Sequence, residues 1–301
     1  NDTIPAKEVW RVSEDGELRD PFKKLTTVFQ MSEEMFFLHY GKDGCNRHVL
    51  IDECRELFGE IYEQIPELPF CNIWTAMQLS SRLPKGALFH MGVSNTRRCW
   101  NMFQLPESVE SACNVGCCGI DGCVSTLVGA SLVNPDRLCY VVVGDLTFFY
   151  DLNSLGNHHI GTNLRVMLVN NGRGTEFRLG IHHCNVFGDD ADKYMAAAGH
   201  FGNKSPLLVK HYAEDLGFHY LSATTKEEFM TALSNFTNPQ LSDHSMILEV
   251  FTDSKDESEA LYLMSHIQSD AKGMVRSKLK DAVRNVAGEK GINAIKKILK
   301  K

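Results

Sequence analysis

Two polar pairs follow successive apolar runs in this 301-residue sequence, and their residue types suit a metal site. Gly144-Asp145 ends the run LCYVVVGD, and Asn170-Asn171 ends the run LRVMLVNN. Mg²⁺ binds oxygen ligands in near-octahedral geometry, and proteins supply one or two of them while phosphates and water complete the shell. The Asp145 carboxylate, the Asn171 side-chain oxygen and the Arg173 backbone carbonyl are candidate ligands. The pattern therefore predicts Mg²⁺ bound together with a diphosphate.

The surrounding turns can hold the diphosphate. A helix is expected to begin near Thr147, and a turn at Ser94 follows another apolar run. Unpaired N–H groups at such positions favour anions. A simpler interpretation is that Asp145 caps a helix and the two Asn form a turn, because both residue types are favoured there. The presence of both motifs at successive run ends favours the ligand site.

The elements that must position these residues are the strands of a parallel sheet. The apolar runs are residues 87–92, 138–145, 164–171, 218–223 and 245–253, and the helix candidates between them are 72–83, 95–103, 121–133, 148–157, 205–216, 225–236 and 255–268. Continuous apolar runs indicate strands buried on both faces. We expect an α/β fold, a doubly wound parallel sheet with helices on both faces. Ligands of such sheets bind at the carboxyl ends of the strands.

The chain divides by pattern into four parts. Residues 1–45 are typical of short strands, turns and one helix, and are interpreted as the end of a preceding domain. Residues 46–70 are expected to form a helical connector, and residues 71–268 the α/β domain. Residues 269–301 are predicted to form one or two basic amphipathic helices, compatible with weak contact to an anionic membrane surface. The alternative is a terminal helix packed on the domain.

Composition narrows the classes of partner and compartment. Outside residues 271–301, the chain carries 21 Lys and Arg against 36 Asp and Glu, which argues against a nucleic-acid partner. No apolar run approaches the roughly 20 residues that span a bilayer, and the first residues lack the pattern of a signal peptide. The sequence therefore predicts a cytoplasmic protein.

Two longer stretches carry a family resemblance. CNVGCCGIDGCVSTLVGASL (113–132) and VVVGDLTFFYDLNSL (141–155), with the GD and NN motifs, resemble the C-terminal cofactor domain of MenD-like, thiamine-diphosphate-dependent synthases. The resemblance covers roughly residues 71–255, and residues 1–45 resemble the end of that family's central domain. It implies the thiamine-diphosphate-binding fold, with thiamine diphosphate and Mg²⁺ as cofactors.

The resemblance also implies roles for single residues. Asp145, Asn171 and Arg173 would bind Mg²⁺, and Ile120 would be the apolar support that bends the cofactor. The cofactor-binding residues would be Val93, Ser94, Cys118, Gly119, Ile120, Gly144, Asp145, Leu146 and Asn171. For Ile120 the alternative is an ordinary core residue.

The substrate side is where the chain departs from the family pattern. Arg98 matches an arginine that binds a substrate carboxylate, and Glu176 and Phe177 are further substrate candidates. A solvated helix-face arginine is the alternative for Arg98. Val115, Arg173 and Glu176 replace an Arg, a Gly and an apolar residue of the family pattern. These departures leave open whether the acceptor is isochorismate.

The expected reaction is decarboxylation of a 2-oxo acid and carboligation to an acceptor. The activating Glu of the family is expected on another domain, so the catalytic residues are unassigned; His182 and His183, on a predicted covering loop at 178–204, are candidates. The chain alone should be inactive, and the expected assembly is a homodimer, a tetramer, or a complex with a pyrimidine-domain subunit. The alternatives are one subunit of a split 2-oxo acid decarboxylase, or a non-catalytic scaffold that keeps the fold.

Overall fold

The chain forms two compact units, residues 1–62 and 63–301. The computed structural model describes residues 4, 6–41, 49–116, 118–179, 182–194, 200, 202 and 204–267. The predicted basic helices at 269–301 therefore lie outside the described residues. The domain boundaries expected after residues 45 and 70 stay predictions.

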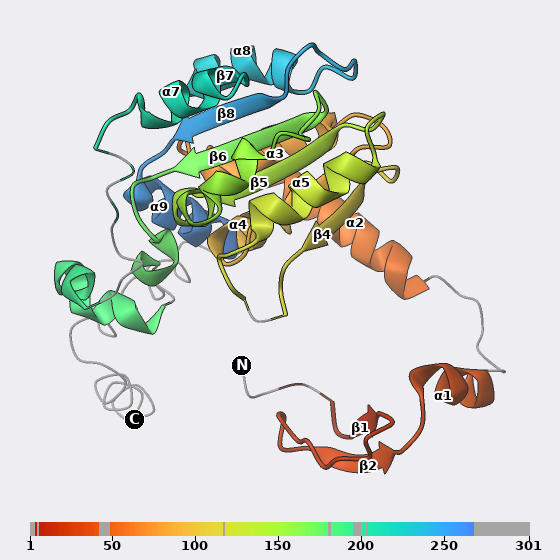
Figure 1. Ribbon diagram of the computed structural model, residues 1–301. Coiled ribbons are helices and arrows are strands. Elements are labelled where there is room, and N and C mark those ends of the chain that lie inside the picture. The colour runs from red at the N-terminus through yellow and green to blue at the C-terminus, as the bar shows by residue number, and fades with distance from the viewer. Residues whose placement is uncertain are drawn as a thin grey trace. The chain divides into compact units, whose positions relative to one another are not determined.

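The first unit contains short strands and helices (Figure 1). Its elements are β1 (Val9–Val12), β2 (Leu25–Phe29), α1 (Glu33–Tyr40) and α2 (Val49–Glu63), the last ending where the second unit begins. β1 and β2 pair in parallel. The ring of Phe29 lies 5.5 Å from Trp10 and 5.0 Å from Phe36, which joins both strands to α1. The short strands and helix match the pattern of residues 1–45.

The second unit is built on a six-stranded sheet (Figure 1). Its strands are β3 (Leu88–Met91), β4 (Glu110–Cys113), β5 (Cys139–Gly144), β6 (Leu164–Asn170), β7 (His219–Ala223) and β8 (Met246–Phe251). All neighbouring strands pair in parallel, in the order β4-β3-β5-β6-β8-β7. The predicted parallel sheet is confirmed. β4 was not expected, because its sequence ESAC is largely exposed and forms no apolar run.

The order of the strands creates a crevice at the carboxyl end of the sheet. The chain passes from β3 to β4 on one side and returns to β5 on the other side of β3. Connections that leave adjacent strands in opposite directions open a gap between them, where ligands of such sheets bind. Ser94 follows β3, and Asp145 follows β5. The topology therefore brings the two predicted turns to the same crevice.

Helices and 3₁₀ segments connect the strands. The helices are α3 (Asn72–Leu79), α4 (Asn95–Trp100), α5 (Cys123–Val133), α6 (Asp145–Tyr150), α7 (Leu208–Asp215), α8 (Lys226–Phe236) and α9 (Ser254–Ser265). The 3₁₀ segments are η1 (Ser80–Arg82), η2 (Leu152–Gly156), η3 (Thr175–Arg178) and η4 (His183–Lys193). The helix predicted at 148–157 begins earlier, at Asp145, and is divided at Asp151 into α6 and η2. None of the helices in the described ranges is long and apolar enough to cross a membrane.

Alternate residues of β5 cover the two faces of the sheet. Tyr140 and Val142 pack in a cluster with side chains of α3, α4, α8 and α9. Val141 and Val143 pack in a second cluster with side chains of α5, α6 and α7. Successive side chains of a strand point to opposite faces, so both faces are buried under helices. The fold is therefore doubly wound, as the continuous apolar runs predict.

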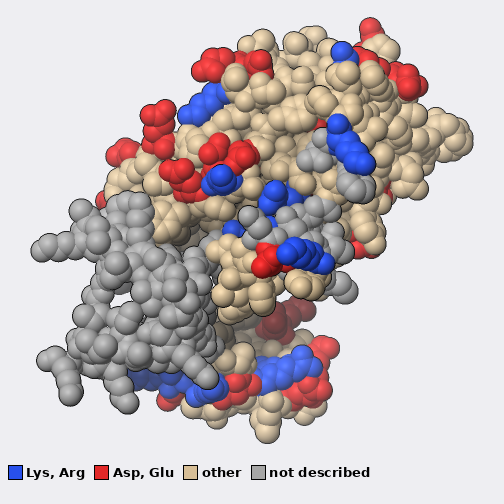
Figure 2. All heavy atoms as spheres, turned by 90° about the vertical axis from the view of Figure 1, so that its left-hand side faces the viewer, with Lys and Arg blue, Asp and Glu red and all other residues tan. Residues whose placement is uncertain are grey.

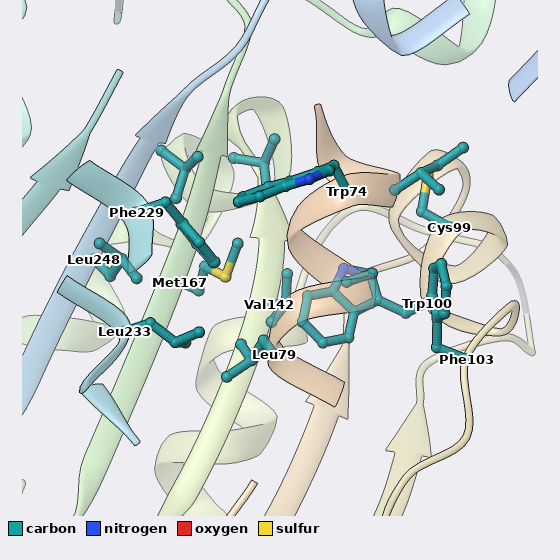
Figure 3. Close-up of a cluster of buried hydrophobic side chains, with 14 of the residues drawn as sticks. Trp74, Leu79, Cys99, Trp100, Phe103, Val142, Met167, Phe229, Leu233 and Leu248 are labelled. Carbon is teal, nitrogen blue, oxygen red and sulfur yellow. The ribbon is translucent and has the colours of Figure 1, made fainter. Parts of the chain in front are cut away.

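The first of these clusters holds large side chains from helices and strands (Figure 3). Val142, Met167 and Leu248, from three adjacent strands, lie beside Trp74 of α3 and Phe229 of α8 in this view. Burying one side chain of this size contributes about 1.5–3 kcal/mol. The core thus fixes the sheet that carries the crevice.

Charged side chains of both signs occur on the face shown in Figure 2. Acidic and basic groups are interspersed there among uncharged residues. The formal net charge of the whole chain is −7. The described part of this face therefore presents mixed charge.

Candidate functional site

A cavity of about 270 Å³ lies at the carboxyl ends of the central strands. Residues after β3, β5 and β6 contribute to its wall, as does the segment before α5. Of the residues predicted to form the site, it is lined by Val93, Ser94, Cys118, Ile120, Gly144, Asp145, Leu146, Asn171, Arg173, Glu176 and Phe177. The fold therefore brings together residues that are up to 84 positions apart in the sequence, from Val93 to Phe177. Gly119 and Arg98 do not line the cavity.

Asp145 joins the ends of two strands. It is the first residue of α6 and is only 2% exposed. Its Oδ1 accepts the Leu146 N–H at 2.8 Å, and its Oδ2 accepts the N–H groups of Asn171 at 3.2 Å and Gly172 at 2.6 Å. Gly172 has a φ of 81°, a conformation that glycine adopts readily. The carboxylate is therefore held rigidly between the ends of β5 and β6.

The oxygen atoms around Asp145 fit a hard cation. The Asn171 side-chain oxygen accepts the Arg173 N–H at 3.4 Å, a long bond that leaves it capacity for a ligand. No cluster of three or more His, Cys, Asp and Glu able to hold a metal occurs among the described residues. One carboxylate and one amide oxygen match Mg²⁺, which takes few protein ligands when phosphates and water supply the rest. The metal roles of Asp145, Asn171 and Arg173 stay predictions.

The backbone of the cavity wall is strained at two places. Ser94 has φ 58° and ψ −122°, and Cys118 has a φ of 53°. Among the described residues, Lys23 is the third non-glycine with positive φ, and it belongs to the other unit. Such conformations cost about 1–3 kcal/mol each and concentrate at functional sites. Ser94 lies in the crevice beside the start of α4, as the sequence predicts for a diphosphate turn.

His200 contacts Asp145 from outside the cavity lining, a contact that the sequence reasoning missed. Its Nε2 lies 3.1 Å from the Asp145 Oδ2, although this ring nitrogen makes no hydrogen bond with the described residues. The ring also packs against Phe149, with 5.1 Å between centroids. His200 belongs to the same His-rich loop as the predicted candidates, and no periodicity in that loop singles it out.

The two histidines chosen from the sequence lie outside the cavity lining. The His182 Nδ1 accepts the Cys184 N–H at 3.1 Å, and its ring packs against Phe177. His183 is exposed. This geometry gives His182 a local capping role, and the structure supplies no contact between either histidine and Asp145.

Arg98 and Glu176, both predicted to contact substrate, form an ion pair with each other. The Arg98 Nη1 donates to the Glu176 Oε2 at 2.7 Å, and Nη2 donates to Oε1 at 2.9 Å. These hydrogen bonds to Glu176 raise the pKa of Arg98 above its ordinary value. Arg98 was predicted to bind a substrate carboxylate, with a solvated helix-face arginine as the alternative. In the structure it binds a carboxylate of its own chain, and its substrate role stays a prediction.

Two buried acids stand behind the cavity and were not anticipated. Glu249 of β8 accepts from the Asn170 Nδ2 at 2.7 Å and from the Tyr220 hydroxyl at 2.8 Å. Burial raises its pKa. This contact explains why the first Asn of the pair does not line the cavity: Asn170 packs within the sheet, whereas Asn171 lines the cavity.

Glu257 of α9 is the second buried acid. Its Oε1 accepts the Asn72 N–H at 3.0 Å and the Thr252 hydroxyl at 2.8 Å, while Oε2 has no hydrogen-bond partner within the described part of the chain. Burial raises its pKa to about 7. Asn72 lines the cavity, so this acid supports the wall from behind.

Known proteins resemble this chain over most of its length. It is 33% identical over 263 residues to the 2-succinyl-5-enolpyruvyl-6-hydroxy-3-cyclohexene-1-carboxylate synthase of Bacteroides fragilis, an alignment that covers 85% of this chain and 45% of that protein. The synthase of the same name from Phocaeicola vulgatus is 32% identical over 265 residues, covering 85% and 44%. That of Cytophaga hutchinsonii is 32% identical over 239 residues, covering 79% and 39%.

The relatives are longer than this chain. The chain spans about half the length of the curated relatives it matches, at 45% and 44% of the first two named. No protein-family model matches it. The sheet, the cavity and the matched synthases agree with the resemblance carried by the GD and NN motifs. The chain is therefore a MenD-like member of the thiamine-diphosphate-dependent enzymes.

Proposed function

We propose that the protein to which this chain belongs decarboxylates a 2-oxo acid and joins the remaining fragment to an acceptor, with thiamine diphosphate and Mg²⁺ as cofactors. The chain is the half that binds the diphosphate. The observation that carries this proposal is the placement of Asp145, which is buried at the strand crossover beside Asn171 and the Ser94 turn. The matched synthases support the same class of reaction.

The residues of the cavity divide into binding and orienting groups. Asp145 and Asn171 would hold Mg²⁺ through side-chain oxygens, with the Arg173 carbonyl as a third ligand. The Ser94 turn and the start of α6 would bind the diphosphate through N–H groups. Ile120, which is half-buried and lines the cavity, would support the cofactor on its apolar side.

Thiamine diphosphate, when bound, supplies the electron sink for loss of carbon dioxide. Of the two carboxylates among the predicted lining residues, Asp145 is assigned to Mg²⁺ and Glu176 is paired with Arg98. The acid that activates the cofactor is therefore assigned to another domain or subunit, in a dimer, a tetramer or a complex with a pyrimidine-domain subunit. The same arrangement of residues would also suit a chain that is one subunit of a split 2-oxo acid decarboxylase.

The acceptor is proposed to differ from isochorismate. Support comes from Glu176, whose carboxylate holds the arginine that the family pattern gives to a substrate carboxylate. Arg173 also lines the cavity, where the family pattern has a glycine.

The direct test is a thermal melt of the chain with thiamine diphosphate and Mg²⁺ added separately and together. A ligand that binds only the folded state adds roughly 2.7 kcal/mol at about 100 times its dissociation constant. We expect a rise in melting temperature for the wild type with both ligands, and none for Asp145→Ala. Asp136→Ala, an exposed change after α5, is the matched control and should keep the rise. Equal shifts in both variants would contradict the proposal.

A further inference from the structure

The Arg98–Glu176 pair stands at the boundary of the cavity. Glu176 lines the cavity, whereas Arg98 does not. Their side chains are 32% and 20% exposed, respectively, so the pair is neither fully solvated nor fully buried. Anything that approaches this wall from the cavity meets the Glu176 side chain, with its partner guanidinium beyond it.

The geometry of the pair uses both oxygens of the carboxylate and two nitrogens of the guanidinium. The two bonds, at 2.7 and 2.9 Å, are the fork-to-fork arrangement in which Arg binds a carboxylate most strongly. Because the pair is partly buried, salt and water screen its electrostatic attraction less than they screen that of an exposed pair. A ligand carboxylate at this wall would have to displace Glu176 or lie beside its charge.

The pair also joins two cavity elements that are distant in sequence. Arg98 belongs to α4, whose start follows the strained Ser94, and Glu176 belongs to η3, which follows β6. Asn95 at the start of α4 and Phe177 in η3 line the same cavity. The pair therefore fixes the wall on which the acceptor side of the site is built.

We propose that Glu176 is a specificity-determining residue that fills the place of a ligand carboxylate at Arg98, so that this wall selects a substrate group without negative charge. The inference deepens the proposed function, since it concerns the substrates of the same cavity. The recognised group is a neutral polar or apolar one.

Binding of two matched probes tests the proposal. Cyclohexene-1-carboxylate and cyclohexene-1-carboxamide have the same ring and differ in charge. Their dissociation constants would be measured by ligand-observed NMR at low salt, with and without thiamine diphosphate and Mg²⁺. The wild type is expected to bind the amide at least as tightly as the carboxylate.

Two single variants move the preference in opposite directions. Glu176→Gln leaves the guanidinium without a balancing carboxylate, so binding of the carboxylate should strengthen about tenfold relative to the amide. Arg98→Gln leaves the Glu176 charge unbalanced, so binding of the carboxylate should weaken relative to the amide. The double variant should return the ratio to near the wild-type value. Because the two single variants alter different helices, a folding defect in one leaves the other as a test.

Glu110→Gln is the matched control. Glu110 pairs with Arg137 at 2.8 Å, and neither residue lines the cavity. This change should leave the ratio of the two dissociation constants unaltered. Melting curves of all variants show whether each is folded at the temperature of the titration.

Three results would overturn the proposal. One is a wild type that already prefers the carboxylate, since the pair would then open for an anion. The second is an unchanged ratio in both Glu176→Gln and Arg98→Gln. The third is absence of carboxylate binding to Glu176→Gln, because a released guanidinium should attract it. The ratio of the two dissociation constants measured without cofactor depends on the Arg98–Glu176 pair alone. The shift in melting temperature with thiamine diphosphate tests the proposed function. The two proposals can therefore fail separately.

Discussion

Two carboxylates line the same cavity and differ in what holds them. Asp145 accepts three backbone N–H groups, whereas Glu176 accepts the two-pronged guanidinium of Arg98. Backbone N–H groups carry only partial charges, and the His200 Nε2 at 3.1 Å from Oδ2 is not a permanent cation, so Asp145 has no partner equivalent to a guanidinium. The charge of Glu176 is balanced within the protein. Under the proposed function, the partner of each carboxylate, and not its residue type, would decide whether it serves a ligand.

The largest effect is expected when the Asp145 side chain is removed, which tests how much its three N–H contacts contribute to stability. Asp145→Ala leaves three N–H groups at the ends of two strands without their acceptor, so the free energy of unfolding without ligands should fall by about 4 kcal/mol. Urea unfolding measures it. Asp136→Ala should change it by less than about 0.5 kcal/mol. A loss below about 1 kcal/mol would mean that water replaces the carboxylate without penalty.

Glu257 sharpens the comparison, because it is a buried carboxyl group with neither a guanidinium nor a ligand role. Its pKa of about 7 in the folded protein exceeds the ordinary 4.5. The folded state therefore holds the proton more tightly, and the resulting stabilisation is complete below about pH 4.5 and lost as the pH rises to about 7. The difference of 2.5 units corresponds to about 3 kcal/mol.

Glu257→Gln removes this titration and keeps an oxygen acceptor. The wild type, relative to the variant, should lose about 3 kcal/mol of unfolding free energy between pH 4.5 and 8. Urea unfolding across that range checks it, with Glu259→Gln as an exposed control on the same helix. A constant difference between wild type and variant would contradict the raised pKa.

A double-mutant cycle measures how strongly Glu176, the second of the two carboxylates, interacts with Arg98. The coupling free energy between Arg98 and Glu176 should be about 1 kcal/mol, because the pair is only partly buried, and should shrink as salt increases. The same cycle on Arg137 and Glu110 should give less, since Glu110 is 73% exposed. Equal coupling free energies in the two cycles would show that the Arg98–Glu176 pair interacts no more strongly than the exposed Arg137–Glu110 pair.

The smallest expected effect concerns the strained turn at Ser94, which lines the same cavity as the two carboxylates. Ser94→Gly should raise the free energy of unfolding by about 0.5–1 kcal/mol, because glycine adopts φ 58° and ψ −122° without strain. Ser94→Ala loses the hydroxyl but keeps the strain, so it should not stabilise. Thermal melting of both variants separates the two effects. A stabilised Ser94→Ala would assign the gain to the hydroxyl.

The sheet and the Asp145 side of the site were predictable because their signals are local. Continuous apolar runs indicate strands buried on both faces, and polar residues at their ends must meet at one edge of a parallel sheet. In the structure Ser94, Asp145 and Asn171 line one cavity, and their ligand roles stay predictions. β4 was not predicted because its largely exposed sequence contains no continuous apolar run.

The other parts of the site depend on contacts between distant residues. Arg98 and Glu176 are 78 positions apart, and the sequence suggested both as substrate residues without showing that they pair. His200 and Glu257 likewise acquire their surroundings only through folding. A side chain's partner is set by three-dimensional packing, which neither periodicity nor spacing encodes.

The position of η3 has a consequence for how such a site diversifies. This four-residue segment lies after β6, outside the sheet, and Thr175 is its one buried member. Its other residues can be exchanged with little effect on the core, while Asp145 remains anchored by the ends of β5 and β6. Under the proposed function, residues of η3 would set selectivity for the acceptor while Asp145 would retain the cofactor, so the two properties would be under separate mutational control. Single substitutions in η3 would then change the acceptor without loss of cofactor binding.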